Sequence, residues 1–418
     1  MNNEKKTIRD PIHGDIKIQD IFLELIETPE IQRLHNIKQL GLANLVFPGA
    51  HHKRLEHSLG AYYMAYRASE MLNLSKEENT WISCAALLHD IGHGPFSHTL
   101  EALLRDLMNV DHIDLTEELI LGEHAIFEYD EKEYINTPSV FDVLNKYEID
   151  NKKIVDILRG RTEDKQFLSQ LLNSSIDVDQ LDYLVRDAYY TVVAYGMIDT
   201  ERFLQTLLIS DNKLAISKKG VGVVESILMA RSLMYSSVYF HKTVRIAEIM
   251  LSKAIEMIES ADPFEYFKMT DGELINHLKK KGVYQNEIAT RLKYRNLFKQ
   301  VYAESKTNLT KEEISIIEKM YDPKIRKEKE QEFEEKLGIP HGHIIIDPPC
   351  KELHLSEPRI DQTDIIVLDG QNKKKLENYT PIGEAVKKRP IPDWFIMIVT
   401  DEKYRDKVSA NAKKILFN

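Results

Sequence analysis

The chain has 418 residues, with 67 acidic and 56 basic side chains and a formal net charge of −11. This length exceeds the size at which one hydrophobic core stops growing, so we expect more than one folding unit. The negative charge argues against sequence-independent binding of duplex nucleic acid, which needs many phosphate contacts from basic side chains.

Cysteine content and the N-terminal sequence indicate where the protein resides. Cys84 and Cys350 are the only cysteines, which does not indicate a disulfide framework. The first residues lack the apolar core of a signal peptide, and the longest apolar runs are too short to span a bilayer. We therefore expect a soluble cytoplasmic protein without a membrane partner.

The first elements are predicted to be short. Alternating apolar residues around Asp10-Pro11 predict a strand, a turn and a strand over residues 7–19. A helical pattern over residues 20–41 breaks before Pro29. The next helix begins near Glu56 and places His57 on its apolar face. Taken alone, His57 is most simply an ordinary hydrogen-bonded core histidine.

The most informative stretch is residues 87–98, where three histidines and an aspartate follow an apolar run. Ser75 and Glu78 have the capping-box pattern, and the helix they begin is predicted to reach His89-Asp90. Adjacent buried imidazole and carboxylate groups are costly unless they are paired or bound to a metal. This mixture suits several divalent ions, among them Mn, Mg, Fe, Zn and Ni, and does not choose between them.

A second polar constellation begins at Asp177. One face of this predicted helix is apolar, and the other carries Asp179, Tyr183, Arg186 and Asp187. Such a face is often simply solvated and held by an Asp–Arg pair. Alternatively, Asp179 completes a ligand set with the histidines and aspartate identified above.

Residues 207–216 predict a short hairpin, and residues 223–259 predict one long helix. The helix carries cations and aromatic rings along one face: Arg231, Tyr235, Tyr239 and Lys242. These side chains could hold phosphates and stack on a base, or they could be ordinary surface residues. Residues 324–336 form a mixed-charge run that predicts a solvated helix.

Strand patterns near residues 343–346, 365–368 and 395–399, followed by a helical pattern over residues 401–417, predict a small C-terminal α+β unit. We therefore expect a mainly α protein with three parts: a catalytic core over residues 1–260, accessory helices over residues 261–340, and the small unit over residues 341–418.

Several stretches are more specific than the isolated histidines and aspartates. They are Asp10-Pro11-Ile12-His13-Gly14, Gln32-Arg33-Leu34, Lys38-Gln39-Leu40-Gly41, Phe47-Pro48-Gly49-Ala50, residues 54–60, residues 87–98, and Asp177-Val178-Asp179 with Asp182-Tyr183 and Arg186-Asp187. On these stretches the chain resembles the HD-domain deoxynucleoside triphosphate (dNTP) triphosphohydrolases, strongly over about residues 7–245 and weakly beyond. The resemblance implies an HD-domain helical core with small β-hairpins. Because Asp10-Pro11 lies near the start, we expect no sterile-alpha-motif domain before it.

The resemblance also implies an activity and the residues that perform it. A divalent metal would support water attack at the α-phosphorus of a dNTP, which yields a deoxynucleoside and triphosphate. The implied metal ligands are His57, His89, Asp90 and Asp179. The implied proton-handling or α-phosphate residues are His93, His98 and His112, with Glu101 orienting a histidine. The implied triphosphate ligands are Arg54, Arg231 and Lys242. The implied sugar-site residues are Gln39, Leu40, Tyr183, Asp187 and Tyr239.

Family members form homo-oligomers, so the resemblance implies a dimer or tetramer. It also implies a possible activating nucleotide. Three departures stand out. Gln180 replaces a phosphate-binding lysine, and Glu101 replaces an aspartate. The family's contacts to an activating guanine nucleotide are not reproduced at Arg9, Glu27 and His35.

Two other readings of the sequence compete with a dNTP triphosphohydrolase. One is an HD phosphohydrolase that acts on a nucleoside monophosphate, a cyclic nucleotide or an alarmone. The other is a non-catalytic module that senses nucleotides or binds single-stranded nucleic acid and keeps a structural metal.

Overall fold

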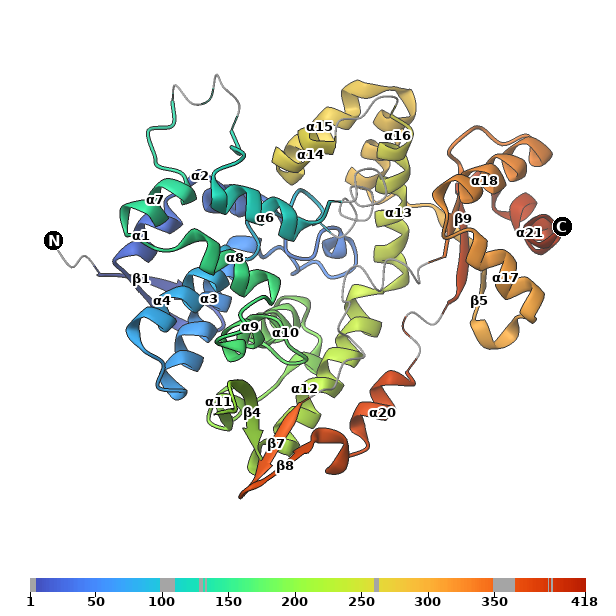
Figure 1. Cartoon of the computed structure of the whole chain (residues 1–418). Helices are drawn as coiled ribbons and strands as arrows, with labels where there is room; N and C mark the ends of the chain where they lie inside the picture. The colour runs from blue at the N-terminus through green and yellow to red at the C-terminus, as the bar shows by residue number, and fades with distance from the viewer. Residues whose placement is uncertain are drawn as a thin grey trace.

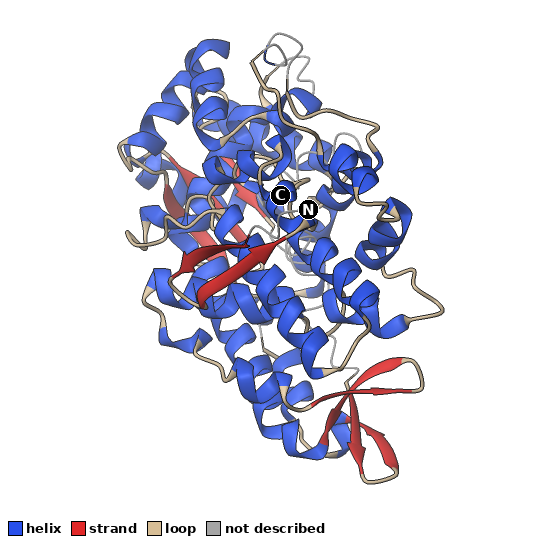
Figure 2. Cartoon of the chain, turned by 90° about the vertical axis from the view of Figure 1, so that its left-hand side faces the viewer, coloured by secondary structure: helices blue, strands red, loops and turns tan. Residues whose placement is uncertain are grey.

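The computed structural model describes residues 5–97, 110–127, 131, 134–258, 263–348, 365–389, 391 and 394–418. Within these ranges the chain is mainly helical, as the sequence predicted, with one hairpin and two small sheets (Figures 1 and 2). A large N-terminal body contains the motif-bearing helices. A smaller lobe contains the last helix, at the right of Figure 1.

The N-terminal strands confirm the predicted strand–turn–strand. β1 (Lys5–Asp10) and β2 (Gly14–Gln19) pair antiparallel, and Asp10 Oδ1 accepts the backbone N–H groups of Ile12 and His13 in the turn. Two short helices follow, α1 (Ile21–Ile26) and α2 (Pro29–Arg33), with the expected break at Thr28. The turn places His13 against the core.

Three helices build the centre of the body: α3 (Arg54–Met71), α4 (Lys76–Leu88) and α10 (Val178–Thr191). The predicted capping box at Ser75 is confirmed, because Glu78 N–H donates to Ser75 Oγ and Ser75 N–H donates to Glu78 Oε2. α3 and α10 approach closely at Gly60, where a Cβ atom would lie 1.8 Å from Asp182 Oδ1. The absence of a side chain at Gly60 is what lets the two helices meet there.

Five further helices surround these three: α6 (His112–Leu121), α7 (Val140–Lys146), α8 (Asn151–Arg159), α9 (Gln166–Leu172) and α11 (Thr200–Leu204). The predicted hairpin is formed by β3 (Leu207–Ser210) and β4 (Lys213–Ser217). β7 (Ile366–Asp369) and β8 (Asn372–Lys375) extend it, and β4 pairs with β7 in parallel. Strands from near the C-terminus therefore lie on the N-terminal body (Figure 1).

The single helix expected over residues 223–259 is wrong, because the chain breaks at Phe240-His241. α12 (Val221–Met234) continues as a π-helical turn, Tyr235–Tyr239, and α13 (Lys242–Glu256) then begins a new helix. The His241 side chain accepts the N–H of Thr243 and so caps α13. Arg231 and Lys242 consequently belong to different helices.

One helical stretch, Lys218–Tyr239, is long and apolar enough to cross a membrane by length and composition alone. The sequence showed no uninterrupted apolar run of this length, because Glu225 and Arg231 lie within it. Half of its most apolar window is buried in the fold, and so is Arg231. We therefore interpret this stretch as a core helix.

The C-terminal half adds helices around a three-stranded antiparallel sheet in the order β5-β9-β6. The strands are β5 (Lys299–Glu304), β6 (Ile344–Asp347) and β9 (Ile396–Thr400). The helices are α14 (Pro263–Lys268), α15 (Asp271–Lys281), α16 (Val283–Lys293), α17 (Lys311–Lys319), α18 (Pro323–Leu337), α20 (Ile382–Lys387) and α21 (Arg405–Phe417). We propose that the chain has three parts, divided at residues 260 and 340. The pairing of β4 with β7 crosses both of these boundaries.

The prediction that residues 324–336 form a solvated helix is wrong for one face of α18. Glu330, Phe333 and Glu334 are buried, and Glu330 is only 1% exposed. Glu330 accepts the N–H of Ile346 at 2.9 Å, and Glu334 accepts the N–H of Gly342 at 2.7 Å. The two glutamates thus satisfy backbone donors at the β6 edge, a role that a pattern of apolar residues cannot reveal.

Val192 should be a strained position whose relief stabilises the protein. It ends α10 in the left-handed backbone region, with φ 58°, and its side chain is 88% exposed. A branched side chain is disfavoured there, whereas glycine is not. We expect Val192→Gly to raise the free energy of unfolding by about 1 kcal/mol, measured by urea denaturation.

Gly160 provides the reciprocal control, because it ends α8 with φ 74° and an added Cβ would meet no atom within 4 Å. Gly160→Val should lower the free energy of unfolding by about 1 kcal/mol. A destabilised Val192→Gly variant would contradict this account of strain.

Candidate active site

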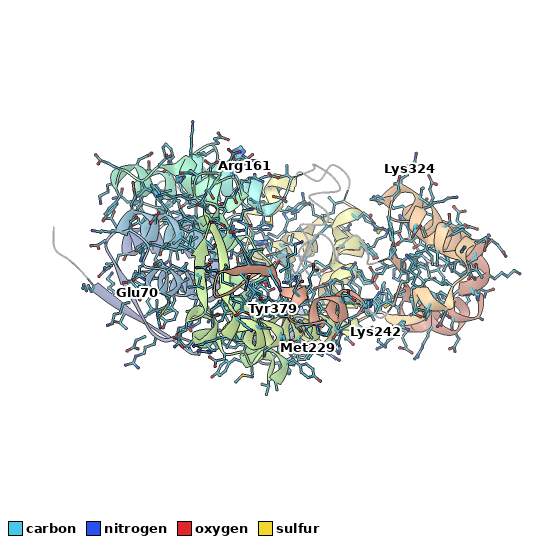
Figure 3. All side chains as sticks on the ribbon, turned by 60° about the horizontal axis from the view of Figure 1, so that its bottom comes forward. Glu70, Arg161, Met229, Lys242, Lys324 and Tyr379 are labelled. Atoms are coloured by element: carbon cyan, nitrogen blue, oxygen red, sulfur yellow. The ribbon has the colours of Figure 1, made fainter. Side chains whose placement is uncertain are left out.

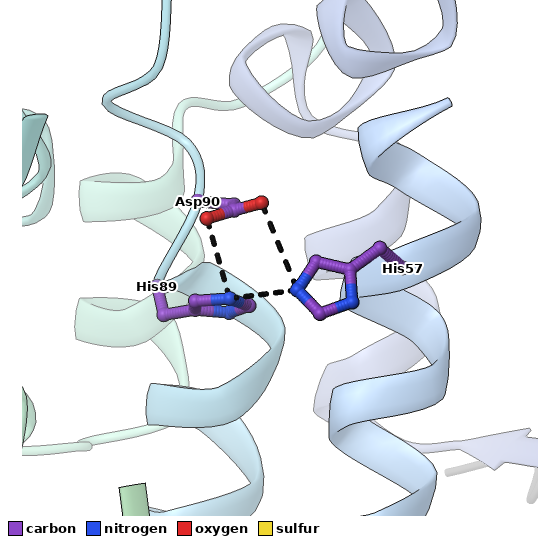
Figure 4. A group of neighbouring side chains, drawn as sticks. All are labelled: His57, His89 and Asp90. Carbon is purple, nitrogen blue, oxygen red and sulfur yellow. Dashed lines mark hydrogen bonds and ion pairs between the residues drawn. The ribbon is translucent and has the colours of Figure 1, made fainter. Parts of the chain in front are cut away.

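Four side chains bring their donor atoms together where α3, α4 and α10 meet. His57 Nε2 lies 3.2 Å from His89 Nε2, which lies 3.2 Å from Asp90 Oδ1 (Figure 4). Asp179 Oδ1 lies 2.9 Å from His57 Nε2 and 3.6 Å from His89 Nε2. His57 Nε2 lies 3.9 Å from Asp90 Oδ2. The donor atoms of His57, His89 and Asp90 are close enough together to hold one metal ion, and Asp179 lies beside both imidazoles.

Hydrogen bonds on the far side of each imidazole determine which nitrogen faces this centre. His57 Nδ1 donates to Asp182 Oδ2 at 2.8 Å, and His89 Nδ1 donates to the carbonyl oxygen of Ala86 at 2.7 Å. Both rings therefore present Nε2 as the atom that can bind an ion. Such outer partners fix the tautomer and orientation of metal-binding histidines.

Asp182 is the hub of a buried network behind His57. Its carboxylate also accepts from His13 Nε2 at 2.7 Å and from Arg186 Nε and Nη2, both at 2.9 Å. Arg186 in turn donates to Asp10 Oδ2 at 2.8 Å. Burial would raise the pKa of Asp182, but Arg186 and the two histidines hold that pKa well below its usual range. The carboxylate is therefore charged and fully hydrogen-bonded.

Sequence reasoning gave Asp182 and His13 no role. They appeared only within the stretches that carry the family resemblance, and the predicted polar face included Arg186 without its partner. The available signal was the four-residue spacing between Asp182 and Arg186, which places opposite charges side by side on one helix.

The charges at the centre favour a cation. Burial alone would lower the pKa of His57, but hydrogen bonds to Asp179 and Asp182 outweigh it and raise that pKa to about 10. Burial would raise the pKa of Asp90, whereas Arg54, His89 and His93 keep it well below its usual range. The carboxylates that keep a proton on His57 would also stabilise a divalent ion that replaces this proton.

Arg54 lies directly beside this centre. Its Nη1 donates to Asp90 Oδ2 at 2.6 Å, and its Nε donates to Ser97 Oγ at 2.9 Å. Its buried Nη2 has no hydrogen-bond partner among the residues that the structure describes. The guanidinium is thus oriented by a predicted metal ligand and retains a donor for an anion.

His93 and His112 stack with ring centroids 3.9 Å apart, and His93 Nε2 lies 3.3 Å from Asp90 Oδ1. Burial lowers the pKa of His93 well below its usual range, and the positive charges of Arg54 and His112 lower it further. His93 is therefore neutral in this structure. The other two predicted catalytic residues, His98 and Glu101, lie outside the described residues.

Asp187 lies in a second polar group that a row of aromatic rings connects to the centre. It accepts from His52 Nε2 at 2.8 Å and from the Tyr239 hydroxyl at 2.6 Å. The Tyr239 ring contacts that of Tyr183, with centroids 6.1 Å apart, and Tyr183 contacts His57 at 6.3 Å. Sequence reasoning gave no role to His52, which follows His51 just before α3.

Gln39 and Leu40, predicted at the sugar site, are both buried. The Gln39 N–H donates to the carbonyl oxygen of His52, which joins this loop to the one before α3. Gln39 Oε1 and His52 Nδ1 are buried without a hydrogen-bond partner in the described part of the chain. Buried polar atoms without partners are unusual and mark a place where a ligand can supply them.

The predicted phosphate ligands Arg231 and Lys242 lie in different surroundings. Arg231 is buried, and its Nη1 donates to the Ser175 carbonyl oxygen at 2.7 Å and to Gln180 Oε1 at 3.1 Å. Gln180, at the position of the family's lysine, therefore orients Arg231. Lys242 is exposed at the start of α13, after the helix break, on the lower edge of the view in Figure 3.

A second group of residues that could bind a metal is neutralised by an arginine. Glu287, His343 and Asp401 bring their side-chain atoms close together. Arg291 Nε donates to Glu287 Oε1 at 2.8 Å, and Arg291 Nη2 donates to Asp401 Oδ2. Because the guanidinium already compensates both carboxylates, we interpret this group as an ion-pair network.

The helical core and its two histidines and two aspartates define a class, the HD-domain proteins. The family model for the HD domain matches residues 54–187, and the model for the HD associated region matches residues 198–417. The chain belongs to the HD phosphohydrolase family, which confirms the family expected from the motifs.

Two relatives and two solved structures show how far the similarity extends. An uncharacterized protein of Methanocaldococcus jannaschii is 34% identical over 98% of this chain and 82% of its own length. The human deoxynucleoside triphosphate triphosphohydrolase SAMHD1 is 31% identical over 71% of this chain, which spans about half of that protein, 55%. A hypothetical protein from Aquifex aeolicus has a TM-score of 0.73 at 29% identity, covering 98% of this chain and all of its own. A phosphohydrolase from Bacteroides thetaiotaomicron has a TM-score of 0.70 at 26% identity, covering 95% of this chain and all of its own.

The hydrogen bond from His57 to Asp182 should matter for metal affinity. Asp182→Asn removes the negative charge that orients His57 and should weaken metal binding about 10- to 100-fold, measured by titration of the metal-free protein. The change also breaks a buried ion pair, so stability will fall. Asp10→Asn is the matched control, because it removes the other carboxylate of Arg186 without touching His57. An equal loss of affinity in both variants would contradict a specific role for Asp182.

Metal affinity should increase with pH. The pKa of His57 is raised to about 10, so the metal-free protein keeps its proton through neutral pH, and an ion must displace that proton. Each ion bound then releases about one proton, and we expect affinity to rise about tenfold per pH unit between about pH 7 and pH 9. Calorimetric titration in buffers of different ionisation enthalpy measures both quantities. A pH-independent affinity with no proton release would contradict this prediction.

Proposed function

We propose that the protein is a metal-dependent dNTP triphosphohydrolase. Water attacks the α-phosphorus, the bond from that phosphorus to the 5′ oxygen breaks, and a deoxynucleoside and intact triphosphate are released. The observation that carries the proposal is the connection of the four-residue centre to Arg54 on one side and, through Tyr183 and Tyr239, to Asp187 on the other. The activity printed in the name of the human relative supports the same reaction.

His57, His89, Asp90 and Asp179 would hold a divalent ion, Mn, Mg, Fe, Zn or Ni. Such an ion lowers the pKa of water and polarises a phosphoryl oxygen. The Arg54 Nη2 atom, buried and without a partner in the described chain, then donates to a phosphate oxygen. Arg231, held by Gln180, and the exposed Lys242 supply further positive charge for the triphosphate.

Proton transfer falls to the histidines beside Asp90. The leaving 5′ oxygen needs a proton, and a histidine can donate one if its pKa is near the working pH. His93 is neutral because burial, Arg54 and His112 lower its pKa, and a bound polyanion would raise that pKa by screening the neighbouring positive charges. We propose that His93 and His112, together with His98 and Glu101, handle this proton.

The sugar site combines polar and apolar contacts. Each oxygen of Asp187 accepts one hydrogen bond, and a carboxylate can accept about four, so Asp187 can also accept from a 3′-hydroxyl. The Gln39 Oε1 atom would accept from the same group. Leu40 lies against the ribose, and the rings of Tyr183 and Tyr239 shape its surroundings.

We further propose that the protein is cytoplasmic and forms a homo-oligomer, a dimer or a tetramer. We also propose that a nucleotide can activate the protein. Hydrolysis of one dNTP would then depend on the presence of another, which mixtures of dNTPs can reveal.

Hydrolysis in water enriched in oxygen-18 tests the proposed reaction. With Mn or Mg and each dNTP, alone and in mixtures, we expect the deoxynucleoside and triphosphate as products. The heavy oxygen should appear in the triphosphate, because attack occurs at phosphorus. Asp90→Ala should lower kcat/KM about 100- to 1,000-fold or more without unfolding the protein. Chromatography and mass spectrometry identify the products.

Other outcomes favour the competing functions. No triphosphate from any dNTP, with hydrolysis of a nucleoside monophosphate, a cyclic nucleotide or an alarmone, would favour an HD phosphohydrolase with another substrate. Undiminished nucleotide binding by Asp90→Ala, with no turnover by the unmodified protein, would favour a non-catalytic module.

A further inference from the structure

Two side chains, Arg33 and Asp271, connect residues 267–271 of the HD associated region to the backbone of the loop that follows His89-Asp90. Arg33 Nη2 donates to the carbonyl oxygens of Ile91 and His93, at 3.0 and 2.7 Å. Its Nη1 donates to the carbonyl oxygens of Phe267 and Met269, at 3.2 and 3.3 Å. One buried guanidinium thus joins the catalytic loop to a segment more than 160 residues away in sequence.

Asp271, the first residue of α15, makes a second connection. Its Oδ1 accepts the N–H of Phe96 at 3.0 Å, and its Oδ2 accepts the N–H of Lys38 at 3.0 Å. The Asp271 side chain is buried, and the two donors belong to two different active-site loops. One carboxylate therefore sets the distance between the loop of residues 38–40 and the loop of residues 91–97.

The first of these loops carries the predicted sugar-site residues Gln39 and Leu40. Lys38 pairs with Lys53 in an isolated antiparallel bridge. Gln39 N–H donates to the carbonyl oxygen of His52, and Arg54 N–H donates to that of Ile37. A shift of Lys38 would therefore move Gln39 together with the residues that precede α3.

The second loop carries a residue in a strained backbone conformation. Phe96 is buried and has φ 48°, a region that residues other than glycine seldom adopt. A Cβ atom on Gly41 would lie 3.9 Å from Phe96 Cα, so the two loops touch. Strained residues persist only where surrounding contacts hold them, and Asp271 supplies such a contact to the Phe96 N–H.

We propose that Asp271 is a positioning residue that holds the sugar-site loop in register with the HD loop, so that the HD associated region orients the substrate. This inference rests on the proposed function for its effect on turnover. It assigns no contact between Asp271 and the substrate, and it leaves the metal ligands untouched.

Asp271→Asn is the informative change. An amide keeps one acceptor oxygen but replaces the other with an NH2 group, which cannot accept an N–H, so Lys38 or Phe96 loses its partner. The matched control is Asp347→Asn. Asp347 is also a buried carboxylate of the HD associated region, but it accepts from Arg245 and Trp394 rather than from an active-site loop.

Three measurements on the full-length, metal-loaded protein test the proposal. Asp271→Asn should speed amide hydrogen exchange in peptides that cover residues 34–42 or 92–97. It should lower kcat/KM for a dNTP about 10- to 100-fold, with KM contributing, because displacement of positioning groups by about 1 Å has effects of this size. Metal content should equal that of the unmodified protein. Asp347→Asn should change none of the three.

Unchanged exchange in both loops, or an equal loss of kcat/KM in Asp347→Asn, would overturn the proposal. Loss of the metal in Asp271→Asn would also overturn it, since the effect would then lie at the centre itself. If the unmodified protein hydrolyses no dNTP, the proposed function fails, and the exchange measurement alone decides the role of Asp271.

Discussion

The candidate active site depends on one buried carboxylate, that of Asp182. It accepts from His57 and His13, and Arg186 offsets its negative charge. Because His57 Nδ1 donates to Asp182, His57 Nε2 is left to face Asp90, Asp179 and a metal ion. Gly60 gives the space for this contact, so a glycine on α3 and an aspartate on α10 together determine where the metal would lie.

Side-chain contacts to backbone groups recur wherever distant segments meet in this molecule. Asp271 and Arg33 hold the loops around the active site, and Glu330 and Glu334 hold β6. A charged side chain that hydrogen-bonds backbone groups fixes both the position and the orientation of the segment it binds. Apolar packing alone fixes them less sharply. The HD associated region is therefore connected to the HD domain by directional bonds as well as by shared core.

The sequence predicted much of this molecule for identifiable reasons. The hairpins, the capping box at Ser75 and the inward position of His57 follow from local patterns, because each depends on residues close in sequence. The hub at Asp182, the contacts of Asp271 and the buried face of α18 were missed, because each depends on partners far away in the chain. The break at Phe240-His241 escaped notice because no proline or glycine marks it.

The glutamates of α18 also limit how copies of this chain can assemble. A strand at the border of a sheet ordinarily offers its unpaired amides to a strand of another molecule. At β6 the carboxylates of Glu330 and Glu334 already occupy such amides. Two protomers are therefore not expected to join their sheets through the β6 border, and a quaternary contact at this border would be built from side chains.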